Sequence, residues 1–178
     1  MLLPDDRADR TFRDYHRGHR QAAATQDDDA PRFQIPEAGD PYPRSSLPAL
    51  EGATWVREAH PDRFRVFAMA LFEAFFGGNE DISDLAVLGR VAEQCEMSAA
   101  ALSEVIREQR YRGRVLAEHQ EALGLGIRGI PAVVVPGRPP IVGAAPYFDL
   151  RGAVEAALQA AADARGSAAG TSPERGTR

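Results

Sequence analysis

The feature that most limits the fold is a change of residue pattern at Gly126. Residues 126–146 read GIRGIPAVVVPGRPPIVGAAP, so two glycines and a proline lead directly into a β-branched run. The run at 132–135 predicts a short strand, the Pro-Gly pair predicts a turn, and 141–142 predicts a second strand antiparallel to the first. Because a two-stranded hairpin is marginally stable by itself, the rest of the chain must supply elements that pack on it.

Helical periodicity dominates the chain before this hairpin. Residues 7–24 predict a polar helix, and residues 25–45, which contain four prolines, predict a connecting arm. Four helices are expected next: from Ser45 or Ser46 to about His60, from Asp62 to Gly77, from a Ser83 cap, and a long one from a Ser98 cap to Gly124 or Gly126. The core of this helical block is expected to contain Leu50, Trp55, Phe67, Leu71, Leu88 and Val105.

The two ends of the chain are also interpretable. Leu2 and Leu3 indicate the stub of a buried strand, and Pro146 begins a final amphipathic helix that reaches about residue 162. The predicted organisation is therefore residues 1–45 as strand stub, helix and arm, 46–125 as an inserted helical subdomain, 126–162 as hairpin and helix, and 163–178 as a disordered tail of low apolar content.

Composition restricts the possible partners and the compartment. The net charge of −5 argues against nucleic acid as a general partner. No segment reaches the roughly 18 apolar residues of a membrane span, and the first residues have no apolar core of signal-peptide length. The sequence therefore predicts a cytoplasmic protein without a membrane partner.

The order of these segments resembles the DsbA-like thioredoxin-fold family, and within it the FrnE-type disulfide oxidoreductases and the 2-hydroxychromene-2-carboxylate isomerases. The matching stretches are DISDLAVLGRVAEQ at 81–94, GIRGIPAVVV at 126–135 and IVGAAPYFDLRGAVEAAL at 141–158. YPRSSLPALEGATWVREA also resembles the first inserted helix of that family. The resemblance implies an α/β thioredoxin-like fold, N-terminally truncated, with an inserted all-helical subdomain.

The resemblance also implies a substrate-binding loop. The family proline that matches Pro131 is cis, and the backbone of the preceding residue pairs with an extended peptide or with glutathione. Gly129, Ile130 and Pro131 are therefore the expected substrate-binding residues. Glycine at 126 and 129 would give this loop its special backbone dihedral angles. Glutathione is expected as a substrate or ligand, and no cofactor or metal is expected.

The reacting part of the family pattern is missing from this sequence. Family members carry CxxC or a serine at the start of the first helix, where the helix dipole stabilises a thiolate, whereas this chain has one cysteine, Cys95. No catalytic residue is assigned, and whether the chain is an enzyme stays open.

The expected function is thiol–disulfide oxidoreductase by resemblance, without its own redox cysteines. The alternatives are a glutathione-linked isomerase, a non-catalytic peptide- or glutathione-binding module, and a truncated fragment.

Other candidate sites have simpler explanations. Cys95 is expected to be buried or inert rather than reactive, since Glu93 and Glu96 would raise its pKa. His16 and His19 share a helix face, but a solvated face is favoured over a metal site. The run GGNEDISD lacks the order of a calcium loop, and the aromatic set from 64 to 76 has the spacing of core residues.

The short sheet suggests self-association. An unpaired edge is expected beside Val133 and Val135, and such an edge invites pairing with another chain. A homodimer is therefore an expected partner arrangement.

Overall fold

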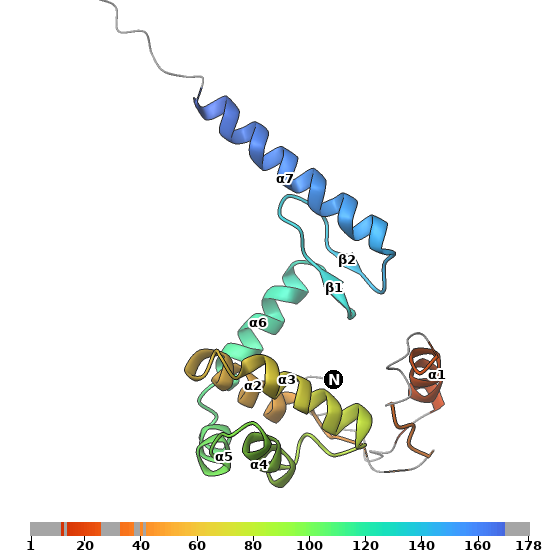
Figure 1. Ribbon diagram of the computed structural model, residues 1–178, viewed down its shortest axis with the longest axis vertical. Coiled ribbons are helices and arrows are strands. Elements are labelled where there is room, and N and C mark those ends of the chain that lie inside the picture. Colours follow the sequence, from red (N-terminus) through yellow and green to blue (C-terminus); the bar gives the residue numbers. More distant parts are fainter. Residues whose placement is uncertain (1–11, 13, 26–32, 38–39, 41, 170–178) are drawn as a thin grey trace, which may run out of the picture. The chain divides into compact units, whose positions relative to one another are not determined.

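The computed structural model describes residues 12, 14–25, 33–37, 40 and 42–169 (Figure 1). The chain forms two compact units, Met1–Ala117 and Glu118–Arg178, which are considered separately below. The strand predicted at Leu2 and Leu3 lies outside the described residues, as does the first part of the helix predicted from residue 7.

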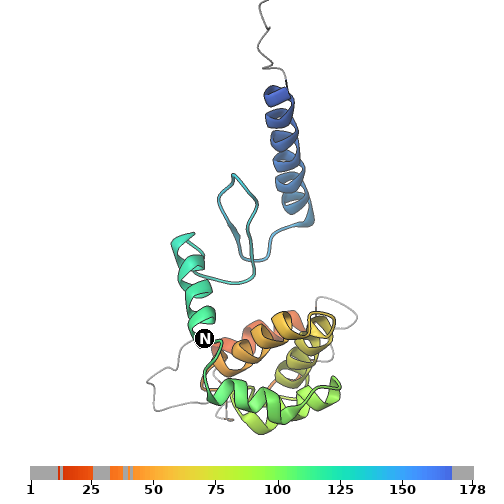
Figure 2. The same ribbon diagram turned by 90° about the vertical axis from the view of Figure 1, so that its left-hand side faces the viewer.

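The first unit is helical in its described part. It contains α1 (Asp14–Ala23), α2 (Leu47–Ala59), α3 (Phe64–Phe72), the π-helical turn η2 (Glu73–Gly77), α4 (Leu85–Gln94) and α5 (Ala99–Arg107), and α6 (Arg112–Gly124) begins in it. Helices α2 to α5 pack side by side as one bundle (Figure 2). This bundle is the helical block that the apolar periodicity predicts.

Short polar side chains cap α4 and α5, whereas Ser46 and Arg63, which precede α2 and α3, make no side-chain capping bond. Ser98 caps α5 as predicted, because its Oγ accepts a hydrogen bond of 3.2 Å from the amide of Ala101. The predicted cap at Ser83 is wrong: Asp84 caps α4. Ser83 instead donates its amide and hydroxyl to Asp81 in the preceding turn, so its side chain is not available to the helix.

The long helix predicted after Ser98 is two helices. α5 ends at Arg107 and α6 begins at Arg112. Gln109 between them has a φ of 55°, in the left-handed region that ends helices. Residues 107–110 read REQR and contain no glycine or proline, so the local composition does not mark the break.

The core lies between α2, α3, α4 and α5. Of the predicted core residues, Phe67, Leu88 and Val105 are buried, Trp55 and Leu71 are half-buried against the core, and Leu50 is 39% exposed. The prediction for Leu50 is wrong because α2 turns Ala49, Gly52 and Val56 inward instead. Gly52 permits close approach of α2 and α5, since a Cβ there would lie 2.9 Å from Cδ1 of Leu102.

Only part of the aromatic set at 64–76 belongs to the core. Phe67 is fully buried, but Phe72 is 58% exposed, which corrects the expectation that the set forms core throughout. Phe75 and Phe76, in η2, face the buried guanidinium of Arg20, whose carbon Cζ lies 4.9 and 5.1 Å from their ring centres. The cation–π contacts join α1 to η2. Arg20 also donates hydrogen bonds to the carbonyl of Gln34 and to Oδ1 of Asn79, which lie outside η2.

The second unit contains the end of α6, the predicted antiparallel hairpin and the last helix. Strands β1 (Ala132–Val133) and β2 (Ile141–Val142) pair with Ala132 opposite Val142, and β1 is shorter than the predicted run at 132–135. Helix α7 (Tyr147–Ala169) continues beyond residue 162, so the prediction of disorder from residue 163 is wrong as far as Ala169. This extension reads DARGSAA, and its three alanines favour helix although it also contains a glycine. Residues 170–178 lie outside the described part.

Candidate functional site

The predicted substrate-binding residues form the segment between α6 and β1. Gly126 ends α6 with a φ of 81°, and the amide of Ile127 donates to the carbonyl of Ala122. Gly126 therefore supplies the left-handed conformation that glycine allows. Gly129 does not have a positive φ, which corrects the expectation of a special dihedral angle there.

The structure brings Gly129, Ile130 and Pro131 together beside the hairpin. The Ile130–Pro131 peptide bond is cis. The carbonyl of Pro131 accepts a hydrogen bond of 2.8 Å from the amide of Gly143, next to β2. A Cβ on Gly129 would lie 3.5 Å from Cγ1 of Val142, so this glycine also lies against β2. These contacts fix both ends of the loop to the second strand.

Ile130 is the most exposed apolar residue recorded in the described part, with 91% of its surface accessible. Neither its amide nor its carbonyl has a recorded hydrogen bond to another described backbone group. A free amide and carbonyl beside a strand can pair with an extended peptide, which is the main-chain part of β-strand addition.

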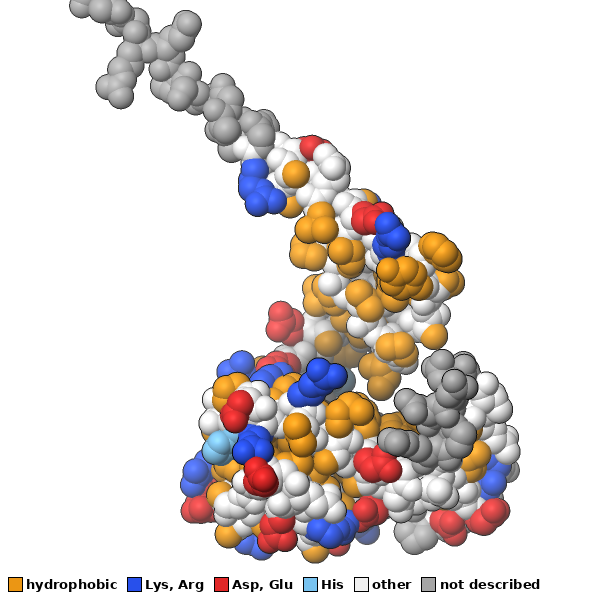
Figure 3. Space-filling model, viewed as in Figure 1, with side chains coloured by type: hydrophobic (Ala, Val, Ile, Leu, Met, Phe, Trp, Pro, Cys, Tyr) orange, Lys and Arg blue, Asp and Glu red, His pale blue; other side chains and the backbone are white. Residues whose placement is uncertain are grey.

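The described sheet has free edges. β1 pairs only with β2 among the residues that the structure describes. Hydrophobic side chains gather over the hairpin and α7 (Figure 3), and the exposed ones are Val133, Val134, Val142, Tyr147, Phe148, Val154 and Leu158. The exposed surface of the hairpin and of α7 is therefore rich in apolar side chains.

Cys95 is not part of this loop. It lies at the C-terminal end of α4 in the first unit and is buried. Burial raises the pKa of the Cys95 thiol, and the positive charge of Arg63 lowers it by a smaller amount. The prediction of a buried cysteine is confirmed, although burial rather than the neighbouring glutamates raises the pKa.

The candidate metal sites gain no support from the geometry. In the part of the chain that the structure describes, no three His, Cys, Asp or Glu side chains come together as a metal site. The side chain of His16 lies outside that part. In GGNEDISD, Gly77 ends η2, Asp81 accepts hydrogen bonds in a turn and Asp84 caps α4. No described helix has the length and hydropathy required to span a bilayer.

A buried carboxylate was missed in the sequence. Glu51, on α2, is completely buried, and its Oε1 accepts a hydrogen bond of 2.9 Å from Nε of Arg112. Its Oε2 has no hydrogen-bond partner in the described structure. The signal in the sequence for this burial was the position of Glu51 on the same helix as Leu47 and Val56, which are buried. Charged residues are almost never fully buried unless they are paired, so the position alone did not predict a buried glutamate.

Comparisons with known proteins agree with this arrangement. The sequence profile described as the DSBA-like thioredoxin domain matches residues 32–155. The crystal structure of a putative protein disulfide isomerase from Nitrosomonas europaea is similar, with a TM-score of 0.59 and 29% identity over 71% of this chain and 65% of that chain. This chain therefore spans less than two thirds of that protein's length. No curated protein matches. The predicted α/β thioredoxin-like fold with a helical insertion is confirmed.

Proposed function

Because the chain belongs to the DsbA-like thioredoxin family, we propose that Gly129, Ile130 and Pro131 bind an extended thiol- or disulfide-containing peptide, or glutathione, for thiol–disulfide exchange. The observation that carries this proposal is the exposed Ile130, whose amide and carbonyl have no recorded backbone partner among the described residues. An extended ligand can use both groups and continue along the edge of β1.

The attacking thiolate in this proposal is not Cys95. Exchange requires a thiolate that reaches a disulfide sulfur, and Cys95 is a buried thiol with a raised pKa. The chain contains no second cysteine. Its contribution is therefore to hold the substrate, while the reacting thiol belongs to the ligand or to another polypeptide segment. We place this activity in the cytoplasm.

Within the family, the proposal favours disulfide exchange over glutathione-linked isomerisation. The similar crystal structure is that of a putative protein disulfide isomerase, and its sequence is 29% identical to this chain. This likeness supports disulfide exchange as the chemistry of the proposal.

The proposal is tested by titrating the ¹⁵N-labelled chain with oxidised glutathione. The expected result is a set of amide shifts centred on Gly129, Ile130 and Ala132. Ile130→Asp should weaken binding by about threefold or more, because the added carboxylate repels an anionic ligand. Leu158→Asp is the matched control, because Leu158 is also an exposed apolar residue of the second unit but lies on α7.

Two results would count against this function. One is a titration in which the loop amides do not shift. The other is equal weakening by Ile130→Asp and Leu158→Asp, which would indicate a general effect of charge rather than binding at the loop.

A further inference from the structure

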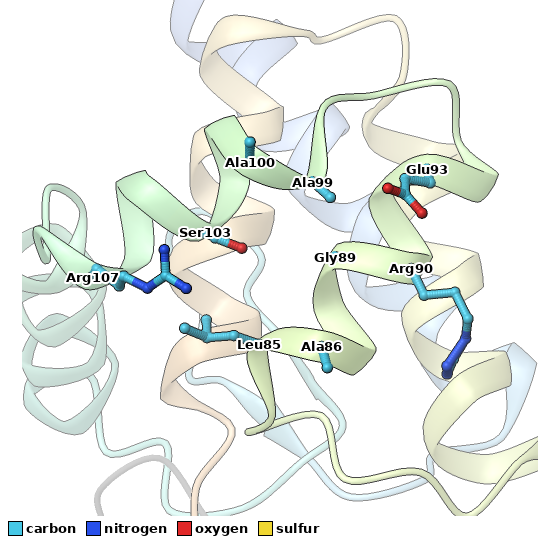
Figure 4. Close-up of a pocket in the computed structure, with 9 residues that line it drawn as sticks. All are labelled: Leu85, Ala86, Gly89, Arg90, Glu93, Ala99, Ala100, Ser103 and Arg107. Carbon is cyan, nitrogen blue, oxygen red and sulfur yellow. The ribbon is translucent and has the colours of Figure 1, made fainter.

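A surface groove lies between α4 and α5, within the first unit. The two helices run antiparallel, and the groove between them has a volume of about 570 Å³ (Figure 4). Small residues make up part of its lining, Ala86 and Gly89 from α4 and Ala99 and Ala100 from α5, and Leu85 is its one large apolar residue. Gly89 keeps the helices close, since a Cβ there would lie 3.3 Å from Cβ of Ala99. The small side chains therefore leave room for a ligand backbone to lie close to both helices.

Opposite charges stand at the two ends of this groove. Arg107, in the last turn of α5, lies at one end, and Glu93, on α4, lies at the other (Figure 4). Neither side chain has a recorded hydrogen bond or ion pair with another described residue. Arg90 also lines the groove, but it forms an ion pair with Glu80. The groove thus offers one uncommitted cation and one uncommitted anion.

A hydroxyl group accompanies the cation. Ser103 lies one helical turn before Arg107 on α5, so the two side chains share a face. A guanidinium and a hydroxyl together donate several hydrogen bonds, and a carboxylate accepts them in a charge-assisted arrangement. Glu93 disfavours a ligand with a second negative group at the opposite end and favours an ammonium group there.

We propose that this groove binds a short peptide through its free carboxyl terminus. Arg107 and Ser103 bind the carboxylate, the small residues lie under the peptide backbone, and Glu93 pairs with the amino terminus. Ala99 to Arg107 spans about 12 Å along a helix that rises 1.5 Å per residue. About four extended residues cover this distance. The groove therefore matches the length of an extended tetrapeptide, and this proposal does not depend on the loop at Pro131.

The test uses the full chain and tetra-alanine with free termini. Amide shifts in a ¹⁵N titration are expected on α4 and α5, and the C-terminally amidated peptide should bind more weakly. Arg107→Gln should reduce the affinity for the free peptide about tenfold and abolish the difference between free and amidated forms. Equal binding of the two peptides to the unmodified chain, or no shift on either helix, would overturn the proposal.

Two further variants separate binding from folding. Arg65→Gln removes an exposed arginine from α3, outside the groove, and should leave the affinity unchanged. Ala100→Leu places a larger side chain in the groove and should block the peptide, while unchanged circular dichroism shows that the helices are intact. If Arg65→Gln weakens binding as much as Arg107→Gln, or if Ala100→Leu still binds normally, the groove is not the site.

Discussion

Nε of Arg112 donates a hydrogen bond of 2.9 Å to Oε1 of Glu51, a carboxylate that is wholly buried in the helical unit. Arg112 is the first residue of α6, so this ion pair joins α6 to α2. A buried charge is strongly unfavourable without a partner, because desolvation is then not offset. Arg112 is therefore the group that makes a glutamate at position 51 tolerable in the core.

Arg112→Met should lower the free energy of unfolding by about 2–4 kcal/mol, because it leaves the Glu51 carboxylate buried without its ion-pair partner. Urea melts measure the change. Arg151→Met is the control, since its pair with Glu155 is solvent-exposed and should contribute less than about 1 kcal/mol. Equal losses in the two variants would show that Glu51 does not depend on Arg112.

Phe67→Ala should cost roughly 3–5 kcal/mol of unfolding free energy, because Phe67 is completely buried between helices of the bundle. Phe72→Ala, five residues along the same helical segment, removes the same ring from a mostly exposed position and should cost much less. A loss below about 1 kcal/mol for Phe67→Ala in denaturant melts would show that the ring is not part of the core.

The sequence was sufficient for the elements whose local signals agree. The β-branched run, the Pro-Gly turn and the following Ile141–Val142 predict the hairpin correctly, because turn chemistry and strand propensity point to the same structure. The cap predicted at Ser98 was also correct, since few neighbouring side chains before this alanine-rich helix compete with the serine for the capping position. The substrate-binding role of the loop at Gly129, Ile130 and Pro131 stays a prediction, which rests on the family resemblance.

The features that were missed depend on tertiary contacts. Gln109 takes a left-handed φ without the glycine that usually marks a helix end, so composition does not reveal the break. Glu51 is buried because Arg112 reaches it from a distant part of the chain, and no local pattern predicts that pairing. Phe72 has the same helical spacing as core residues, but no described element covers it.

Stability should fall at alkaline pH in a way that depends on Cys95. Burial raises the pKa of this thiol in the folded protein, so the unfolded chain loses the proton first as the pH rises above about 8.5. The free energy of unfolding should therefore decrease from that pH until the folded thiol also ionises. Cys95→Ala should show a smaller decrease in urea melts between pH 8 and 10. An identical dependence of stability on pH for both proteins would mean that burial does not raise the pKa of the Cys95 thiol.

The purified chain should show no insulin reductase activity above background. One thiol cannot cycle between dithiol and disulfide within the molecule, and this thiol is buried and protonated at neutral pH. The turbidity assay for insulin precipitation measures the activity, with Cys95→Ser as the control. Activity that is present in the unmodified chain and absent in Cys95→Ser would assign the chemistry to Cys95.

The free edge of the hairpin should make the chain self-associate. β1 has β2 on one side and no other strand beside it in the described structure. Val133 on β1 and Val134 directly after it are exposed, whereas Val135, which was also expected beside the free edge, is buried. Unpaired amide and carbonyl groups next to apolar side chains favour pairing with a strand of another molecule. We therefore expect a homodimer whose population rises with protein concentration in light scattering after size-exclusion chromatography.

Val134→Lys should shift this equilibrium towards the monomer, because a charged edge residue opposes strand pairing. Leu158→Lys adds the same charge on α7 and should leave the equilibrium unchanged. A stable monomer at high concentration, or an equal effect of the two lysine variants, would show that the edge of β1 does not mediate association.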